Sequence, residues 1–245
     1  MSEIVKHDQG LMRKSNKILI LNLIREKRPI SRAELAKITG MSPTSVSRIV
    51  SKLMEFGLIE ETKLTSNGVG RKASLLDTSE LSACSISIYL DLDSCIIGIV
   101  DFDGNLLKEE RLTYDTENLI WTDIMNRVCE TVKEMVKATA ADHIKIVGLG
   151  VAVPGIVDTH RGVVVFSPQL GWTGVNLKKY LEEELGYRVV IENAIKSKAL
   201  AEGIYGGAKD SSSAVYINFG SGVGSALITE DEIFRGTTNS AGEVG

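Results

Sequence analysis

The chain has 245 residues, 43% of them hydrophobic, which allows one large domain or two smaller ones. Its formal net charge of −4 is uneven, because residues 1–77 hold 14 basic and 8 acidic residues, and the remainder holds 14 basic and 24 acidic. A head of net charge +6 on a body of −10 favours nucleic-acid binding through the head. No run approaches the roughly 18 apolar residues of a membrane span, so a membrane protein is excluded.

The cysteines argue against a disulfide-bonded protein, and the histidines argue against a metal-binding one. Cys84, Cys95 and Cys129 lie in apolar stretches without a C-x-x-C pair, which indicates reduced, buried thiols in a cytoplasmic protein. The amino terminus has no apolar segment of the kind found in a signal peptide. The three histidines have no metal-ligand spacing, so no metal site is expected.

The head begins with a predicted helix over 14–27, and two short helical patterns follow between residues 29 and 57. In the first pattern we expect Leu35 and Ile38 on the inner face, and small Ala36 allows a close helix crossing. Gly40 lies in the turn that follows, where glycine adopts positive φ at little steric cost.

The second pattern carries strong start signals. Ser42 is a predicted N-cap, and Pro43 falls at the first helical position, where its missing N–H costs nothing. Apolar residues then recur at i, i+3, i+4 and i+7, which predicts one buried stripe: Val46, Ile49, Val50 and Leu53. The offsets are those of a helix-turn-helix; the alternative is an ordinary helical hairpin within a core.

The opposite face of this second helix carries short hydroxyls and long cations, which suits contact with phosphates and base edges. The candidate DNA-binding residues in the helix are Ser42, Pro43, Thr44, Ser45, Ser47, Arg48 and Lys52.

Two predicted strands, 58–62 and 73–77, flank a glycine-rich basic loop and form the wing of a winged helix-turn-helix. Arg71 and Lys72 in this loop are candidate DNA contacts, since a narrow minor groove favours inserted arginine. The alternative is a solvated basic loop. We therefore assign residues 1–78 to a DNA-binding head and residues 79–245 to a body.

The body reads as antiparallel strands followed by strands that alternate with helices, which predicts an α/β domain with a mixed sheet. Predicted helices are 117–140, 177–185 and 194–205. Predicted strands are 83–90, 95–100, 106–113, 145–153, 163–166, 188–191, 213–219 and 224–229.

Five short motifs occur in order along the body: V-P-G-I-V-D (153–158), S-P-Q-L-G-W (167–172), I-E-N-A (191–194), N-F-G-S-G-V-G (218–224) and A-G-E-V-G (241–245). With the helix-turn-helix before them, they make the chain resemble the ROK family of sugar-responsive repressors and sugar kinases. The resemblance implies an actin-like ATPase (ribonuclease H-like) fold with an incomplete second half. It also implies that the family's zinc site lies beyond Gly245, so no cofactor is expected within this chain.

Two departures from the family's kinase pattern argue against an enzyme. Kinase members have D-x-G-G-T as a first phosphate loop, whereas residues 91–95 here read D-L-D-S-C and lack both glycines. The resemblance places the kinase's proton-accepting aspartate at Ala194, and a methyl group cannot act as a general base. Gly220, Gly222 and Gly224 form the vestige of a second phosphate loop, which we interpret as a tight turn.

The resemblance further implies sugar contacts at Gln169, Asn193 and Glu243, which offer donors and acceptors suited to a polyol. The alternative is that these residues only satisfy one another inside the body. Without the elements that follow Glu243 in family members, the last strands are expected to expose apolar surface.

These observations predict a bacterial, sugar-responsive repressor of carbohydrate genes that forms a homodimer, with operator double-stranded DNA and a sugar or sugar-phosphate effector as partners. Two alternatives remain open. One is an ATP-dependent sugar kinase with an added head, and the other is a remnant that binds DNA constitutively because its sensor half is broken.

Overall fold

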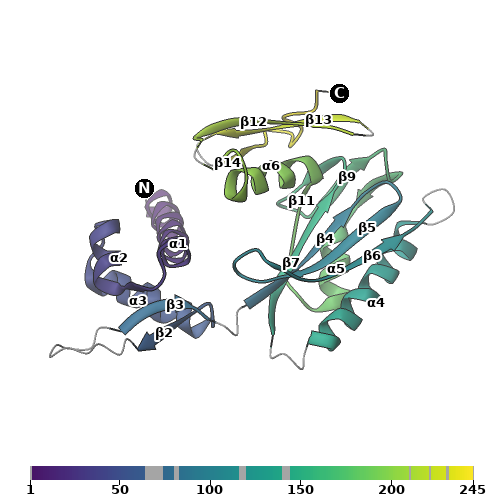
Figure 1. The fold of residues 1–245 in the computed structure, drawn as a ribbon. Helices are drawn as coiled ribbons and strands as arrows, with labels where there is room; N and C mark the ends of the chain where they lie inside the picture. The colour runs from purple at the N-terminus through teal and green to yellow at the C-terminus, as the bar shows by residue number, and fades with distance from the viewer. Residues whose placement is uncertain are drawn as a thin grey trace. The chain divides into compact units, whose positions relative to one another are not determined.

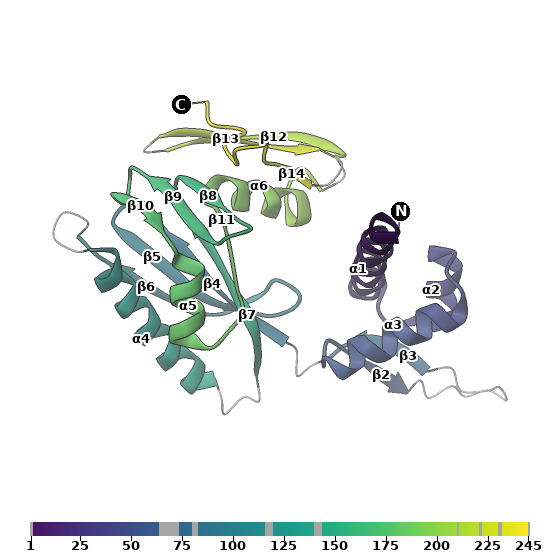
Figure 2. The same cartoon turned by 180° about the vertical axis from the view of Figure 1, so that it is seen from behind.

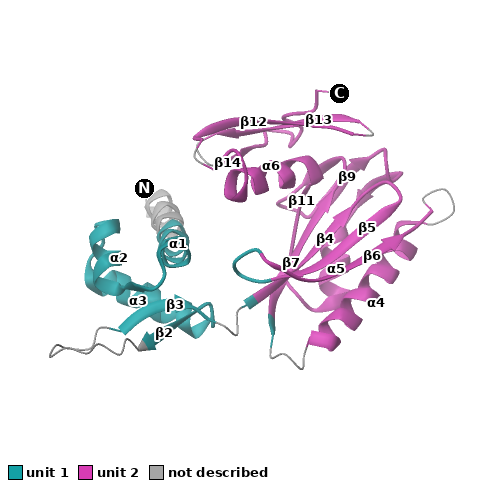
Figure 3. Ribbon diagram, in the orientation of Figure 1, with its two compact units in different colours: residues 1–83, 101–104, 143–145 teal, residues 84–100, 105–142, 146–245 magenta. Residues whose placement is uncertain are grey.

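The chain divides into two compact units, which contain the head and the body (Figure 3). Unit 1 comprises residues 1–83, 101–104 and 143–145, and unit 2 comprises residues 84–100, 105–142 and 146–245. The computed structural model describes residues 2–63, 74–79, 83–115, 120–139, 144–209, 211–220, 222–229 and 232–244. Within these ranges, side chains are described from residue 15 onward, except that of Lys63.

Within its described residues, the head is a three-helix arrangement with a small antiparallel sheet (Figure 1). Strand β3 pairs with both β1 and β2, so β1, which the sequence analysis missed, completes the sheet. The elements are α1 (Ser2–Lys27), β1 (Ile30–Ser31), α2 (Arg32–Thr39), α3 (Pro43–Glu55), β2 (Ile59–Lys63) and β3 (Ser74–Thr78).

One apolar cluster holds the head together, and α1, α2, α3, β1, β2 and β3 all contribute to it. Its buried members include Ile20, Ile24, Leu35, Val46, Val50, Leu53 and Leu76. The prediction for Ile38 was wrong, because its side chain is 49% exposed. Helix α2 packs on the cluster through Leu35 and Ala36, and at about 100° per residue Ile38 lies roughly 200° around the helix from Ala36, away from the packed face.

The body is built on a five-stranded sheet in the order β11-β7-β4-β5-β6. Strands β11 and β7 are parallel, whereas β4, β5 and β6 are antiparallel, which confirms the predicted mixed sheet. Helices α4 and α5 lie side by side along one face of this sheet (Figure 2). The elements are β4 (Ala83–Leu90), β5 (Ser94–Val100), β6 (Leu106–Thr113), α4 (Trp121–Thr139), β7 (Lys145–Val153), α5 (Leu177–Leu185) and β11 (Val189–Asn193).

Two smaller antiparallel sheets complete the body, with strand orders β10-β9-β8 and β12-β13-β14. Helix α6 packs against β13 and β14, and also contacts β11 (Figure 1). The elements are β8 (Ile156–Asp158), β9 (Val163–Ser167), β10 (Trp172–Val175), α6 (Ala194–Tyr205), β12 (Ser213–Phe219), β13 (Val223–Thr229) and β14 (Glu232–Phe234). The sequence analysis missed the short strands β8, β10 and β14.

The structure bears on three expectations for the body. The described helix α4 begins at Trp121, and the predicted start at 117 falls among residues 116–119, which lie outside the described part. Ile120 precedes the helix and is 65% exposed. The expected apolar surface is present on β12, where Val215, Ile217 and Phe219 are exposed by 62%, 52% and 79%. The three cysteines are buried thiols outside any disulfide, as predicted. Burial raises the pKa of Cys95 to about 12, so its thiol is protonated and inert.

Candidate nucleic-acid interface and candidate sugar site

Helix α2 is fixed at both ends before it meets α3. The Ser31 hydroxyl accepts a hydrogen bond from the Glu34 backbone N–H at 3.2 Å, and the Ser31 N–H donates to the Glu34 carboxylate at 2.9 Å. This reciprocal capping box follows from the S-x-x-E spacing, a signal that the sequence analysis overlooked. Gly40 ends the helix with φ of 67°, the left-handed conformation expected of the turn glycine.

Helix α3 begins as the sequence predicts. The Ser42 hydroxyl accepts from the Ser45 backbone N–H at 3.2 Å, and Pro43 occupies the first turn. The predicted stripe of Val46, Ile49, Val50 and Leu53 is buried, which fixes the rotation of the helix about its axis. The alternative of a hairpin buried within a core is excluded, because the other face of α3 is open to solvent.

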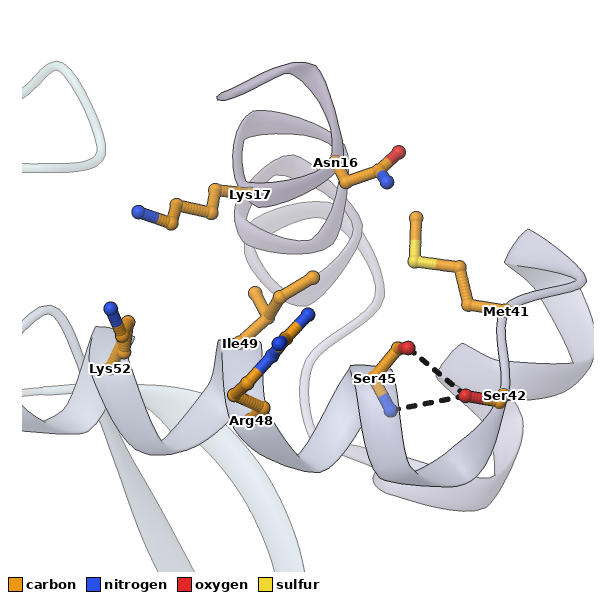
Figure 4. Close-up of a pocket in the computed structure, with 8 residues that line it drawn as sticks. All are labelled: Asn16, Lys17, Met41, Ser42, Ser45, Arg48, Ile49 and Lys52. Carbon is orange, nitrogen blue, oxygen red and sulfur yellow. Dashed lines mark hydrogen bonds between the residues drawn. The ribbon is translucent and has the colours of Figure 1, made fainter. Parts of the chain in front are cut away.

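The outward face of α3 carries the residues predicted to bind DNA (Figure 4). Thr44, Ser47, Arg48 and Lys52 are exposed, and Ser45 is half-buried. The Ser42 hydroxyl is committed to the cap and donates to the Ser45 hydroxyl at 3.0 Å, so these two serines shape the helix start. Among the described residues, no ion pair engages Arg48 or Lys52. Arg71 and Lys72 lie outside the described residues.

In the body, two backbone N–H groups of the turn at residues 91–94 are bonded within the protein. The Asp91 N–H donates to the Ser94 carbonyl at 2.8 Å, and the Leu92 N–H donates to the Asp91 carboxylate at 2.8 Å. The Tyr114 hydroxyl contacts the carbonyls of Asp91 and Ser94, each at 2.8 Å. These two N–H groups are not free to bind a phosphate, and the loss of the phosphate cradle at this turn stays a prediction.

Asn193 lies at the start of α6, is 4% exposed, and is bonded within the fold through both ends of its amide. Its amide oxygen caps the helix by accepting from the Lys196 N–H at 2.9 Å, and its amide nitrogen donates to the Gly155 carbonyl at 2.7 Å. A side-chain amide has two donors and two acceptor positions, so these two bonds use one of each. The adjacent Ala194 is 3% exposed and has only a methyl group.

The glycine loop between β12 and β13 is a tight hairpin. The Gly220 N–H donates to the Gly222 carbonyl at 3.0 Å, and a Cβ added at Gly224 would lie 3.1 Å from the Ile195 side chain. Gly224 therefore permits the close approach of β13 to α6, which gives this glycine a packing role. Gly220 and Gly222 lie in the connection between the two strands, whereas Gly224 lies within β13 and pairs with Asn218.

Lys196 is a buried cation that the sequence analysis missed. Its side chain is 2% exposed, and its ammonium group donates to the Asn239 carbonyl. Burial lowers its pKa, while the carboxylates of Glu192 and Glu243 act in the opposite direction. Lysine is seldom fully buried, so the sequence alone gives no signal that Lys196 is covered. The contact with residue 239 could be found only in three dimensions.

Glu243 lies on the segment that Lys196 helps to hold in place. The Gly242 carbonyl accepts from the Ser225 N–H at 3.1 Å and from its hydroxyl at 2.8 Å. At the other end of the segment, the Arg235 guanidinium donates to the Glu192 carboxylate at 2.6 Å. Glu192 directly precedes Asn193 in the chain. The structure thus ties the exposed Glu243 to the strand and helix that position Asn193.

Gln169 is exposed in the turn after β9, and packing links this turn to Asn193. A Cβ added at Gly155 would lie 2.3 Å from the Phe166 carbonyl oxygen, so the residue that accepts from Asn193 packs against the end of β9. Ser167, two residues before Gln169, has a buried hydroxyl with no hydrogen-bond partner among the described residues. The three predicted sugar contacts therefore lie on connected segments of the body.

The described residues contain no group of three or more His, Cys, Asp or Glu side chains that could hold a metal ion. No helix in the same part of the chain is both long enough and apolar enough to cross a membrane.

A winged helix-turn-helix head and an actin-like α/β body together define a two-part protein in which a DNA-binding fold is joined to a sugar-kinase-like scaffold. Comparison with family models agrees with this class. Residues 87–245 match the ROK family, and residues 13–60 match a model described as winged helix-turn-helix DNA-binding. The chain belongs to the ROK family.

Individual relatives include both regulators and kinases. A xylose repressor from Bacillus spizizenii is 27% identical over 239 residues, which covers 97% of this chain and 61% of the repressor. The crystal structure of a ROK family transcriptional regulator, a homolog of the E. coli MLC protein, superposes with a TM-score of 0.83 at 25% identity, covering 96% of this chain and 59% of that one.

A ROK family glucokinase from Streptomyces griseus, solved with glucose and AMPPNP, superposes with a TM-score of 0.59 at 25% identity. The match covers 66% of this chain and 50% of the glucokinase chain. The kinase thus matches about two thirds of the chain, whereas the regulator matches nearly all of it. The chain spans about three fifths of the length of the curated relatives that it matches.

Proposed function

We propose that this protein is a sugar-responsive DNA-binding repressor of carbohydrate genes. The observation that carries the proposal is the outward face of α3, which presents the cations Arg48 and Lys52. The same face carries the short hydroxyl-bearing residues Thr44, Ser45 and Ser47, and the buried stripe of α3 fixes the rotation of the helix about its axis. A helix of this shape fits the major groove, where cations bind phosphates and side-chain hydroxyls read base edges. The xylose repressor named above supports the regulatory role.

Several finer parts of the proposal follow from the same fold. Two copies of the chain would form a homodimer and read two half-sites, so that Arg71 and Lys72 of each wing reach the flanking groove. The protein would act in the bacterial cytoplasm, and no cofactor is assigned to the residues of this chain.

The effector is proposed to be a sugar bound in the body by Gln169, Asn193 and Glu243. Xylose is the first candidate, because it is the sugar in the name of the Bacillus spizizenii relative. The remaining donor and acceptor of Asn193 and the exposed carboxylate of Glu243 support contact with adjacent hydroxyl groups. Sugar binding would favour one placement of the heads over another and so change DNA affinity.

We also propose that the body is not an enzyme. The closed turn at residues 91–94 and the methyl group of Ala194 support this proposal, because one removes a phosphate cradle and the other removes a general base. The kinase alternative is supported by the resemblance to the glucokinase and by the retained glycine loop. A coupled assay with ATP and glucose or xylose separates the two, since turnover that falls on mutation of Asn193 would establish a kinase.

A gel shift with promoter DNA tests the proposed function. The wild-type protein should retard the fragment, and the double variant Arg48→Ala with Arg71→Ala should not. The matched control is Lys137→Ala with Lys209→Ala, which removes two exposed cations from the body and should bind normally. Failure of the wild type to bind, or equal binding by the Arg48/Arg71 variant, would remove the proposal.

The same gel shift with added xylose distinguishes a working sensor from a constitutive DNA-binding remnant. The proposal predicts release or tightening of the complex by a sugar, and loss of this response in Glu243→Ala. A remnant would bind DNA to the same extent whichever sugar is added.

A further inference from the structure

A pocket of about 370 Å³ lies in the head between α1 and the outward face of α3. Helix α1 contributes Asn16 and Lys17 to its wall (Figure 4). The opposite wall is formed by the turn and α3, through Met41, Ser42, Ser45, Arg48, Ile49 and Lys52. The sequence analysis assigned no DNA-binding role to α1.

The charge of this pocket has one sign. Lys17, Arg48 and Lys52 line it, and none of its eight lining residues is acidic. In Figure 4 the three cationic side chains extend into the space between the helices, while Asn16 and Met41 lie together at the other end. Among the described residues, no ion pair neutralises any of the three cations. Such a cluster attracts an anion, and the positive end of the α3 dipole near Ser42 adds to the attraction.

Helical geometry divides the outward face of α3 into two neighbouring stripes. Ser45, Arg48 and Lys52 fall at i, i+3 and i+7 and face the pocket, whereas Thr44, Ser47 and Ser51 have the same spacing one residue, or about 100°, around the helix. The cations therefore face α1, and the small hydroxyl-bearing residues lie beside them. Small hydroxyl groups suit base edges, and long cations suit phosphates.

We propose that this pocket binds one phosphodiester group of duplex DNA, with Lys17 as a phosphate ligand from outside the helix-turn-helix. The inference rests on the proposed function, since it names the partner's contacting group for the same helix. Lys17 on one wall and Arg48 and Lys52 on the other hold the phosphate between α1 and α3. This contact sets the depth and register of α3 in the groove, and the hydroxyl stripe then meets the bases.

The proposal makes Lys17 a determinant of affinity and not of sequence preference. A phosphate contact carries no base information, so its loss weakens binding to every duplex by a similar factor. It also reduces the salt dependence of binding, because each neutralised phosphate contributes about −0.9 to the slope of log K against log salt concentration.

The experiment is fluorescence anisotropy of a labelled duplex titrated with Lys17→Met at several salt concentrations between about 50 and 200 mM. The expected slope is smaller in magnitude than that of the wild type by about 0.9, with affinity lowered equally for promoter and unrelated duplexes. The matched control is Lys27→Met, an exposed lysine on the same helix about 15 Å further along its axis and outside the pocket lining. It should keep the wild-type slope.

The outcomes separate this inference from the proposed function. If the wild type binds DNA and Lys17→Met has the same slope and affinity, the phosphate site is wrong and the repressor proposal stands. If the wild type binds no duplex, both fail. Competition with inorganic phosphate, against sodium chloride of equal ionic strength, tests a free anion as the occupant. Phosphate that binds through Lys17 without displacing DNA would overturn the proposal, and displacement of DNA would support it.

Discussion

The two candidate sites of this protein are built in opposite ways. The helix-turn-helix of the head comes from one continuous stretch, residues 31–52, and its functional side chains point into solvent from short capped helices. The candidate site in the body comes from segments far apart in the chain, and the fold already uses part of the hydrogen-bonding capacity of the Asn193 amide. A change in the head should therefore affect binding or local stability separately, whereas a change in the body should affect both together.

The chain offers a convenient way to measure the two regions independently. Both tryptophans, Trp121 and Trp172, and all six tyrosines lie in the body. Tryptophan fluorescence therefore reports unfolding of the body, while far-UV circular dichroism also reports the helices of the head.

The largest effect is expected from Leu35→Ala. Leu35 is fully buried in the apolar cluster of the head, so its truncation should cost about 2–5 kcal/mol of the head's stability. Urea unfolding should then show an earlier transition by circular dichroism and an unchanged transition by tryptophan fluorescence. The control is Ile38→Ala on the same helix, which is 49% exposed and should change stability by less than about 0.5 kcal/mol. An equal shift in both probes would mean that head and body unfold as one.

A smaller effect is expected from Asn193→Ala in the body. This change removes the cap of α6 and the hydrogen bond to the Gly155 carbonyl, and should cost about 1–3 kcal/mol by tryptophan fluorescence. Asn176→Ala is the matched control, because Asn176 caps α5 in the same way, by accepting from the Lys179 N–H at 3.3 Å, and makes no second side-chain hydrogen bond within the described part of the chain. The control should cost about 1 kcal/mol. Equal costs for the two variants would mean that the Gly155 contact adds nothing.

The smallest stability effect is expected from Ser31→Ala, which removes the cap of α2 and should cost about 1 kcal/mol in the head. It should move the circular dichroism transition only. A shift in the fluorescence transition would contradict the independence of the two regions.

The same capping box predicts a pH dependence confined to the head. The backbone N–H and hydroxyl of Ser31 donate to the Glu34 carboxylate and lower its pKa. Because the pKa is lower in the folded state, this contribution is fully present above the unfolded pKa and is lost as pH falls through the folded value. Thermal melts in the acid range should show a smaller pH dependence for Glu34→Gln than for the wild type. Identical profiles would exclude this carboxylate as a source.

Prediction from the sequence succeeded where a residue's role depends on its near neighbours. The cap at Ser42, the turn at Gly40 and the buried stripe of α3 all follow from spacings within one helix, and all are present. The mixed sheet of the body was also predicted, because an antiparallel start is followed by strands that alternate with helices along the chain.

Prediction failed where the role depends on a distant segment. Lys196 reads as a surface lysine, yet the segment around Asn239 covers it across 43 positions of sequence. Tyr114 closes a turn that begins 23 residues earlier. Ile38 follows Leu35 by three positions, but the packed face of α2 is the side of Leu35 and Ala36, and Ile38 lies outside it. No local pattern encodes these contacts, so only the folded chain reveals them.

Hydrogen–deuterium exchange with and without promoter duplex tests the central claim most directly, because it maps the contact surface without any mutation. The account predicts that DNA slows exchange in peptides that span residues 42–52, with no comparable change in those of β12 and β13. Slower exchange in the body alone, with 42–52 unaffected, would contradict it.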